Sequence, residues 1–107
     1  MAKVAPTVFF PGYTSDGTNI TIPIASLPGL TADEAAADTG DGAEVHRALT
    51  NQVAVTYNAL DEDLRPSNMT IDNPTPTGAS PTTVTKTYES EFTLNIDNEN
   101  AVLQTDA

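Results

Sequence analysis

The chain has 107 residues, with fifteen acidic and four basic side chains and a formal net charge of −11 at pH 7. This length allows one domain around one core, and the charge argues against binding to nucleic acid or to an anionic membrane surface. Without cysteine, the chain forms no disulfide and no thiolate metal site. No apolar run approaches the ~20 residues that span a bilayer, and the N-terminus lacks the apolar core of a signal peptide. We therefore expect a soluble protein that is not secreted.

The N-terminal part of the sequence predicts a loose β-hairpin. Residues 3–10 form its first strand, in which Pro6 has no backbone N–H and therefore favours an edge position. Turn-forming residues follow over 11–19. Isoleucines then alternate with other residues over 20–24, which is the period of a half-buried second strand.

Two helices are predicted next, and each has its own start signal. Thr31 and Glu34 have the spacing of a capping box, which opens a short alanine-rich helix that ends near Ala37. Asp41 is a good N-cap for a longer helix over about 42–60. This longer helix is expected to be the main helix of the fold.

The main helix is amphipathic. Its apolar stripe recurs at steps of three or four residues and consists of Val45, Leu49, Val53, Tyr57 and Leu60. Such a stripe packs against a sheet, so we expect Leu49 and Val53 to be core residues. The acidic residues 61–63 follow, and Pro66 ends any continuation of the helix.

The C-terminal part predicts two strands with a connection of unusual composition. Residues 68–72 form a short strand, and residues 73–83 form a proline-rich extended arm or loop. The next strand, Val84–Ile96, alternates over its whole length and would span about 40 Å, which is longer than a typical strand. We therefore expect its first half to project past the domain.

These elements follow the order β-β-α-α-β-β in a single domain of residues 1–107. They predict an α+β fold, in which an antiparallel β-sheet of about four strands carries the main amphipathic helix, about 42–60, on one face. The alternative is a β-sandwich with an inserted helix.

The sequence contains no recognisable catalytic, cofactor-binding or metal-binding motif. His46 is the sole histidine, and no G-x-S-x-G pattern accompanies it, so we interpret it as an ordinary boundary residue. Asp38, Asp41 and Glu44 recur every third position but lack the pattern of a calcium-binding loop, and we expect them to serve helix ends. The sequence therefore predicts a protein that is not an enzyme and holds no cofactor.

The proline-rich segment is the candidate site for binding another protein. It has no core residues of its own, and its prolines keep it extended. The outer half of the following strand, residues 84–90, would present backbone groups with which a neighbouring chain can pair. We hypothesise that residues 73–90 reach onto an adjacent subunit, and the alternative is a plain surface loop. The residues expected to make the contact are Pro74, Pro76, Pro81, Val84 and Tyr88.

Four features together suggest a known class of protein: a Thr/Ala/Asp-rich composition without Cys or Trp, the capped helix Asp41–Leu60, the segment Asn73–Pro81 and the strand Val84–Ile96. In these features the chain resembles the small accessory structural proteins of tailed-phage virions. These include capsid decoration (cement), minor tail and head-completion proteins. The resemblance implies a virion protein, made in the host cytoplasm, that forms homo-oligomers and docks on a repeating lattice of major capsid or tail protein. A capsid decoration role is the first expectation.

The alternative hypothesis is a free-standing acidic binding or inhibitor domain. It would dock one-to-one on a basic protein surface, for which a net charge of −11 is well suited.

Overall fold

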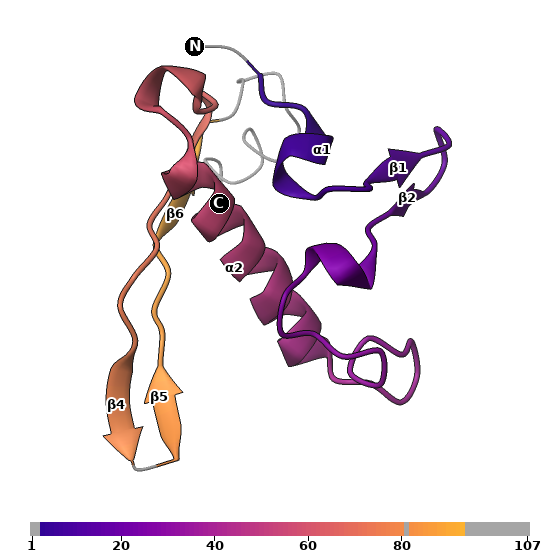
Figure 1. Cartoon of the computed structure of the whole chain (residues 1–107), viewed down its shortest axis with the longest axis vertical. Coiled ribbons are helices and arrows are strands. Elements are labelled where there is room, and N and C mark those ends of the chain that lie inside the picture. The colour runs from indigo at the N-terminus through magenta and orange to yellow at the C-terminus, as the bar shows by residue number, and fades with distance from the viewer. Residues whose placement is uncertain (1–2, 81, 94–107) are drawn as a thin grey trace, which may run out of the picture.

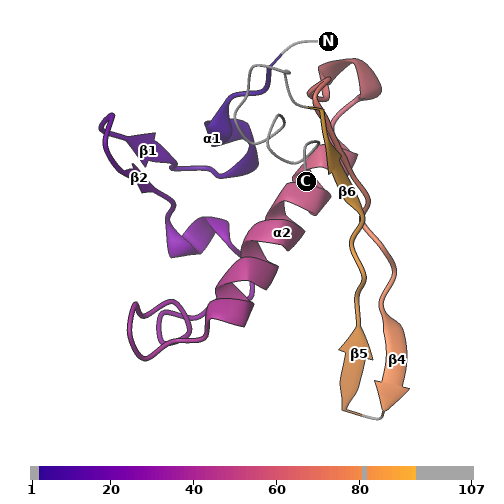
Figure 2. The same ribbon diagram turned by 180° about the vertical axis from the view of Figure 1, so that it is seen from behind.

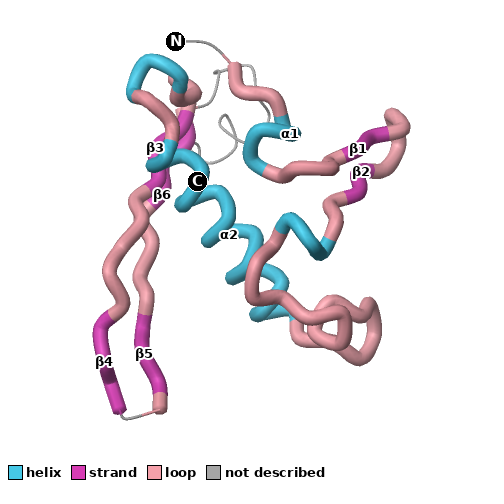
Figure 3. The backbone as a smooth tube through the Cα atoms, viewed as in Figure 1, coloured by secondary structure: helices cyan, strands magenta, loops and turns pink. Residues whose placement is uncertain are grey.

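A computed structural model describes residues 3–80 and 82–93 of the chain (Figure 1). Loops connect one long helix to several short strands (Figure 3). The helical elements are α1 (Pro6–Phe9), the 3₁₀ turn η1 (Ile24–Ser26), α2 (Gly42–Ala59) and the 3₁₀ turn η2 (Glu62–Leu64). The strands are β1 (Thr14–Ser15), β2 (Ile20–Thr21), β3 (Met69–Ile71), β4 (Thr77–Ser80), β5 (Thr83–Thr85) and β6 (Ser90–Phe92).

Helix α2 begins where the sequence predicts it. The Asp41 carboxylate accepts hydrogen bonds from the backbone N–H groups of Ala43 (3.0 Å) and Glu44 (3.3 Å). These bonds satisfy two of the four donors that a helix start leaves free. Glu44 lies in the first turn, where the helix dipole favours a negative charge, and it pairs with Arg47 at 2.8 Å. The predicted main helix over about 42–60 is confirmed.

The predicted first strand over residues 3–10 is wrong, because part of it forms helix α1. Pro6 occupies the first helical turn, where its fixed φ suits a helix and its missing N–H has no bond to lose. The Phe10 N–H closes the turn on the Pro6 carbonyl at 2.9 Å. Phe9 is buried in a cluster with residues of α2, so tertiary packing outweighs the strand preference of these apolar residues.

A short hairpin does form in the N-terminal part, but β1 replaces residues 3–10 as its first strand. Strand β2 covers only the start of the predicted 20–24 segment, and the two strands pair antiparallel. Asp16 organises the turn, because its Oδ1 accepts from the N–H groups of Asn19 (2.7 Å) and Thr18 (2.8 Å). The Asn19 bond, and then the Thr18 bond, hold the pKa of Asp16 below its ordinary value of 3.8.

The predicted capping box forms, but the short α-helix after it does not. The Thr31 N–H donates to Glu34 Oε1 (2.9 Å), and the Glu34 N–H donates to Thr31 Oγ1 (3.1 Å). The chain then makes turns and folds back, so that the Asp41 N–H donates to the Glu34 carbonyl at 2.8 Å. Gly40 lies inside this loop, where a Cβ would overlap the backbone of Glu34 and Ala36. The alanine-rich segment is therefore a closed loop that leads into α2.

The C-terminal strands form one long hairpin in two sections. Strand β3 pairs antiparallel with β6, and β4 pairs antiparallel with β5, with residues 72–76 and 86–89 between the sections. Strand β3 confirms the strand predicted at 68–72. The predicted strand Val84–Ile96 is divided between β5 and β6, and its residues 94–96 lie outside the described residues. The segment predicted as an extended arm, 73–83, contains β4 and therefore pairs with its own neighbour.

The fold class is α+β, as predicted, with one main helix and short antiparallel strands. Within residues 3–80 and 82–93, the strands pair two by two into three small sheets instead of one sheet of four. Pro74 and Pro76 help to explain the interruption in the long hairpin, because a proline cannot donate to a ladder. These separate ribbons do not make the two facing sheets that the alternative β-sandwich requires.

The core is divided into two small clusters along α2. One cluster, at the C-terminal half of the helix, contains Phe9, Ala54, Tyr57 and Ile71, and the other contains Leu27, Leu30 and Ala48. Leu49 and Val53, which the sequence predicts as core residues, are half-buried and pack against the two clusters. Ala48 and Ala54 are the most buried residues of the two clusters, at 2% and 0% exposure.

The chain is more open than a compact domain of its size. Its accessible surface is 7826 Å², whereas about 5700 Å² is typical of a folded monomer of this mass. Its Cα radius of gyration is 16.0 Å, against about 13 Å for a compact domain of this length. Among residues 3–80 and 82–93, the exposed large apolar side chains are Val8, Ile20, Ile24, Val55, Leu64, Val84 and Phe92.

Candidate functional site

The outer section of the C-terminal hairpin projects from the rest of the fold, and we call residues 73–88 the β-arm. Its β4–β5 end diverges from α2 and stands clear of the other labelled elements in both views (Figures 1 and 2). Thr77 lies opposite Thr85, and Gly78 lies opposite Val84. The first part of the predicted last strand thus projects from the domain, but as one side of a two-stranded ribbon.

The structure separates the five predicted contact residues into two groups. Val84 is 66% exposed on β5, and Pro76 is exposed just before β4, so both belong to the projecting part. Pro74 and Tyr88 are half-buried near the root of the β-arm. Pro81 lies outside the described residues. Contact of these residues with another protein stays a prediction.

A polar cluster fastens the root of the β-arm to α2, and we call its four residues the root clamp. Asn51 Oδ1, on α2, accepts from the Tyr88 hydroxyl at 2.6 Å and from Lys86 Nζ at 2.9 Å. Lys86 Nζ also donates to Asn73 Oδ1 at 3.2 Å. The same ammonium lies 5.0 Å from the centroid of the Tyr88 ring, within the range of a cation–π contact. Because both ends of the β-arm are held, its direction relative to α2 is fixed.

Sequence reasoning missed two members of the root clamp. Asn51 lies on the helix face that the pattern assigns to solvent, and Lys86 follows 35 positions later, so no local spacing connects them. One signal was present in the sequence. Lys86 is the sole basic residue after Arg65, and it stands in a run of threonines, with Glu89 three residues later. An isolated cation in such an acidic chain indicates a specific partner within the fold.

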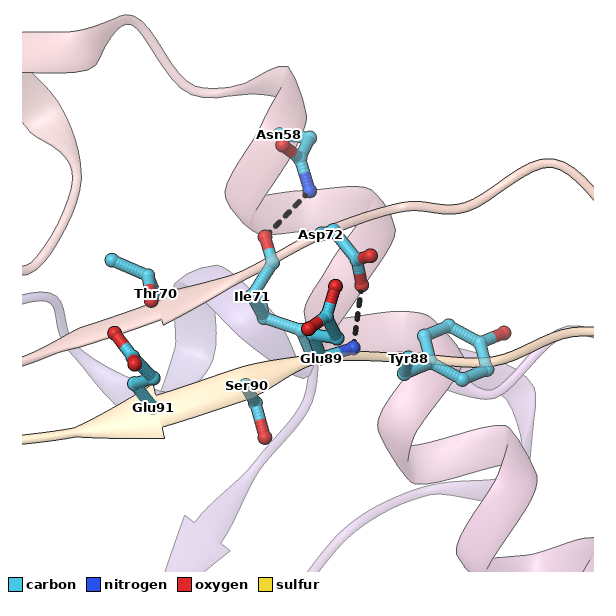
Figure 4. Close-up of a pocket in the computed structure, with 8 residues that line it drawn as sticks. All are labelled: Asn58, Thr70, Ile71, Asp72, Tyr88, Glu89, Ser90 and Glu91. Atoms are coloured by element: carbon cyan, nitrogen blue, oxygen red, sulfur yellow. Dashed lines mark hydrogen bonds between the residues drawn. The ribbon is translucent and has the colours of Figure 1, made fainter.

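An open depression of about 730 Å³ lies along β3, β6 and the residues that adjoin them in the hairpin (Figure 4). The lining residues include Asp72, Glu89 and Glu91, but Asp72 accepts a hydrogen bond from the Glu89 N–H at 2.8 Å and so fastens the two strands together. Asn58 of α2 donates to the Ile71 carbonyl at 3.1 Å, which ties the helix to β3. In the part of the chain that the structure describes, no three metal-ligating side chains come together.

The remaining residues that the sequence analysis considered for catalysis or metal binding lie on α2 or at its start. His46 is exposed on α2. Asp41 and Glu44 are engaged in the helix cap and in the ion pair with Arg47. Asp41 and Glu44 therefore serve the start of α2.

No protein-family model matches the chain, and neither does any curated protein or any solved structure. Among residues 3–80 and 82–93, every helix is too short or too polar to cross a membrane.

Proposed function

We propose that this protein is a non-enzymatic structural protein of a tailed-phage virion. Its role would be that of a capsid decoration protein, which self-associates and docks on a repeating lattice of major capsid or tail protein. The observation that carries the proposal is the β-arm. It projects from the domain and presents Val84 at 66% exposure. Its strands β4 and β5 pair with each other and with no other described strand. A fixed ribbon of this kind is suited to reach a neighbouring subunit.

Two further properties support a role in an assembly. The core is split into two clusters, and large apolar side chains remain exposed on several elements. An assembly would bury such surface, whereas a free monomer gains nothing from it. The projecting ribbon is also preorganised, because the root clamp fixes it before any partner arrives, and preorganisation lowers the entropy cost of docking.

The direct test is the protein content of virions of the phage that encodes the chain. Quantitative mass spectrometry of density-gradient-purified particles should find the chain in a fixed ratio to the major capsid or tail protein. Its absence from purified particles would falsify the virion role.

A shortened variant then tests the β-arm itself. Residues 74–87 are replaced by an Asn-Gly turn, because Asn73 and Tyr88 adjoin the last hydrogen-bonded residues, Asp72 and Glu89, and a two-residue loop suits such a hairpin. The variant should keep the circular dichroism of the folded domain but lose incorporation into particles. Thr85→Ser is the matched control, since it keeps the Thr85 carbonyl that pairs with Thr77. Normal incorporation of the shortened variant would mean that the β-arm is a surface loop.

The second candidate function is a free acidic binding or inhibitor domain. The net charge of −11 favours it, because such a surface attracts a basic protein. The two functions differ in solution behaviour. The binding domain stays a monomer and forms a one-to-one complex, whereas the structural protein self-associates.

A further inference from the structure

A second apolar feature lies across α2 from the β-arm. A groove of about 320 Å³ is formed by β2, η1, the segment after η1 and the N-terminal half of α2, and its lining residues are all apolar. They include Ile20, Ile24, Val45 and Leu49. Ile20 is 61% exposed and Ile24 is 41% exposed, so no described part of the chain covers this wall of the groove.

The distribution of acidic residues connects this groove with the β-arm. The fifteen carboxylates of the sequence are absent from residues 1–15, 17–32, 45–60 and 73–88. Residues 17–32 and 45–60 supply all but one of the side chains that line the groove, and residues 73–88 are the β-arm. Two copies of a chain with net charge −11 repel each other, and the repulsion is smallest where acid-free surfaces meet. The lining of the groove and the β-arm both lack acidic side chains, although Glu34 borders the groove beside Ala35.

The β-arm of the same chain cannot fill the groove. In both views the β-arm descends on one side of α2, whereas β2 and η1 lie on the other side (Figures 1 and 2). The root clamp holds the β-arm in that direction. We propose that the groove receives the β4–β5 end of the β-arm from a second copy of this chain. This inference rests on the self-association in the proposed function and names the surfaces that meet.

The exposed side chain of Val84 is the anchor of this contact. It lies opposite Gly78, so no side chain covers it from across the ribbon, and the space beside Gly78 is open. A two-stranded ribbon is about 5 Å wide between its strands, which leaves one face free to enter an apolar groove. Burial of Val84 against Ile20 and Ile24 removes apolar surface of both copies from water.

The contact is head-to-tail, because the two surfaces lie on opposite sides of α2. Such a contact leaves one β-arm and one groove unused in a dimer, and it therefore continues until a ring closes or a filament grows. The expected species in solution are larger than a dimer.

The test uses sedimentation velocity of the full chain and of two variants at equal concentration in moderate salt. Val84→Asp disables the β-arm, and Ile20→Asp disables the groove. Each variant should sediment as a monomer, with a dissociation constant raised at least about tenfold. Mixed together, the two variants should form a complex of two chains and nothing larger, because one intact β-arm then meets one intact groove.

Leu64→Asp is the matched control. Leu64 is 58% exposed on η2, beyond the C-terminal end of α2, and this variant should keep the mass of the parent chain. Circular dichroism checks that all three variants are folded. A monomeric parent chain, a mixture that stays monomeric, or an unchanged mass for Ile20→Asp or Val84→Asp would each overturn the proposal. An unchanged mass with lower stability for Ile20→Asp would mean that the groove is filled from within the same chain. The virion measurement distinguishes the two proposals, because a chain that is present in particles but whose variants keep the parent mass leaves the virion role standing and overturns this contact alone.

Discussion

Replacing Asn51 by alanine removes the acceptor at the centre of the root clamp. The Tyr88 hydroxyl bond to Asn51 Oδ1 is 2.6 Å long and half-buried, and a neutral bond of this kind contributes about 1 kcal/mol. The bond from Lys86 Nζ is charged, but its donor is partly exposed, so solvent screening reduces its contribution to about 1 kcal/mol as well. Alanine has a better helix propensity than asparagine by roughly 0.5 kcal/mol. Asn51→Ala is therefore expected to lower the free energy of unfolding by about 1.5 kcal/mol.

A double-mutant cycle separates the hydrogen bond from the other effects. Urea unfolding of Asn51→Ala, Tyr88→Phe and the double variant is followed by circular dichroism, and the coupling energy should be about 1 kcal/mol. Tyr88→Phe keeps the ring and its packing, so the cycle reports on the hydroxyl alone. Amide hydrogen exchange in β4 and β5 should also become faster in Asn51→Ala, because the root no longer holds the ribbon. A coupling energy below about 0.3 kcal/mol would refute the claim that this bond fixes the β-arm.

Three further results are expected. Asp41→Ala should lower the free energy of unfolding by about 1 kcal/mol in urea, because two N–H groups at the start of α2 lose their acceptor, and an unchanged value would remove the cap assignment. Ala54 is 0% exposed, so Ala54→Leu should cost about 1–3 kcal/mol in the same assay through overpacking, and a neutral result would mean that this cluster is loosely packed. The carboxyl carbon of Asp16 should titrate by NMR with a pKa below 3.8. Because the folded-state pKa is lowered, the contribution of Asp16 to folding stability is complete above its unfolded-state pKa and is lost as the pH falls through its folded-state pKa. A measured pKa at or above 3.8 would contradict the hydrogen bonds that Asp16 accepts in the turn.

Local signals predicted the main helix well, and long-range packing explains most of what they missed. Asp41 and the periodic residues after it act within a few positions, so the start and the length of α2 follow from the sequence. The segment around Pro6 was ambiguous, because a short apolar run suits a strand or a helix equally well. Burial of Phe9 against α2 decides between them, and that contact joins residues far apart in the chain.

In the candidate site, too, the sequence predicted what depends on local signals and missed what depends on long-range contacts. The composition of residues 73–83 predicted an exposed segment without core residues, and Val84 and Pro76 are exposed there. The pairing of β4 with β5 was missed, because prolines and a glycine hide the alternation that marks a strand. The root clamp depends on Asn51, which meets its partners from 35 and 37 positions away, and such distances leave no periodic trace in a sequence.

The division of the core along α2 has a consequence for how the chain opens. The C-terminal half of the helix belongs to the cluster of Ala54 and Tyr57, and the N-terminal half belongs to the cluster of Ala48. Unfolding of α2 therefore dissolves both clusters together, whereas the β1–β2 hairpin can separate while the helix persists. In hydrogen exchange, the amides of α2 would report the global free energy of unfolding, and the peripheral ribbons would report smaller, local openings. A subunit that docks at either end of the helix would thus slow exchange along its whole length.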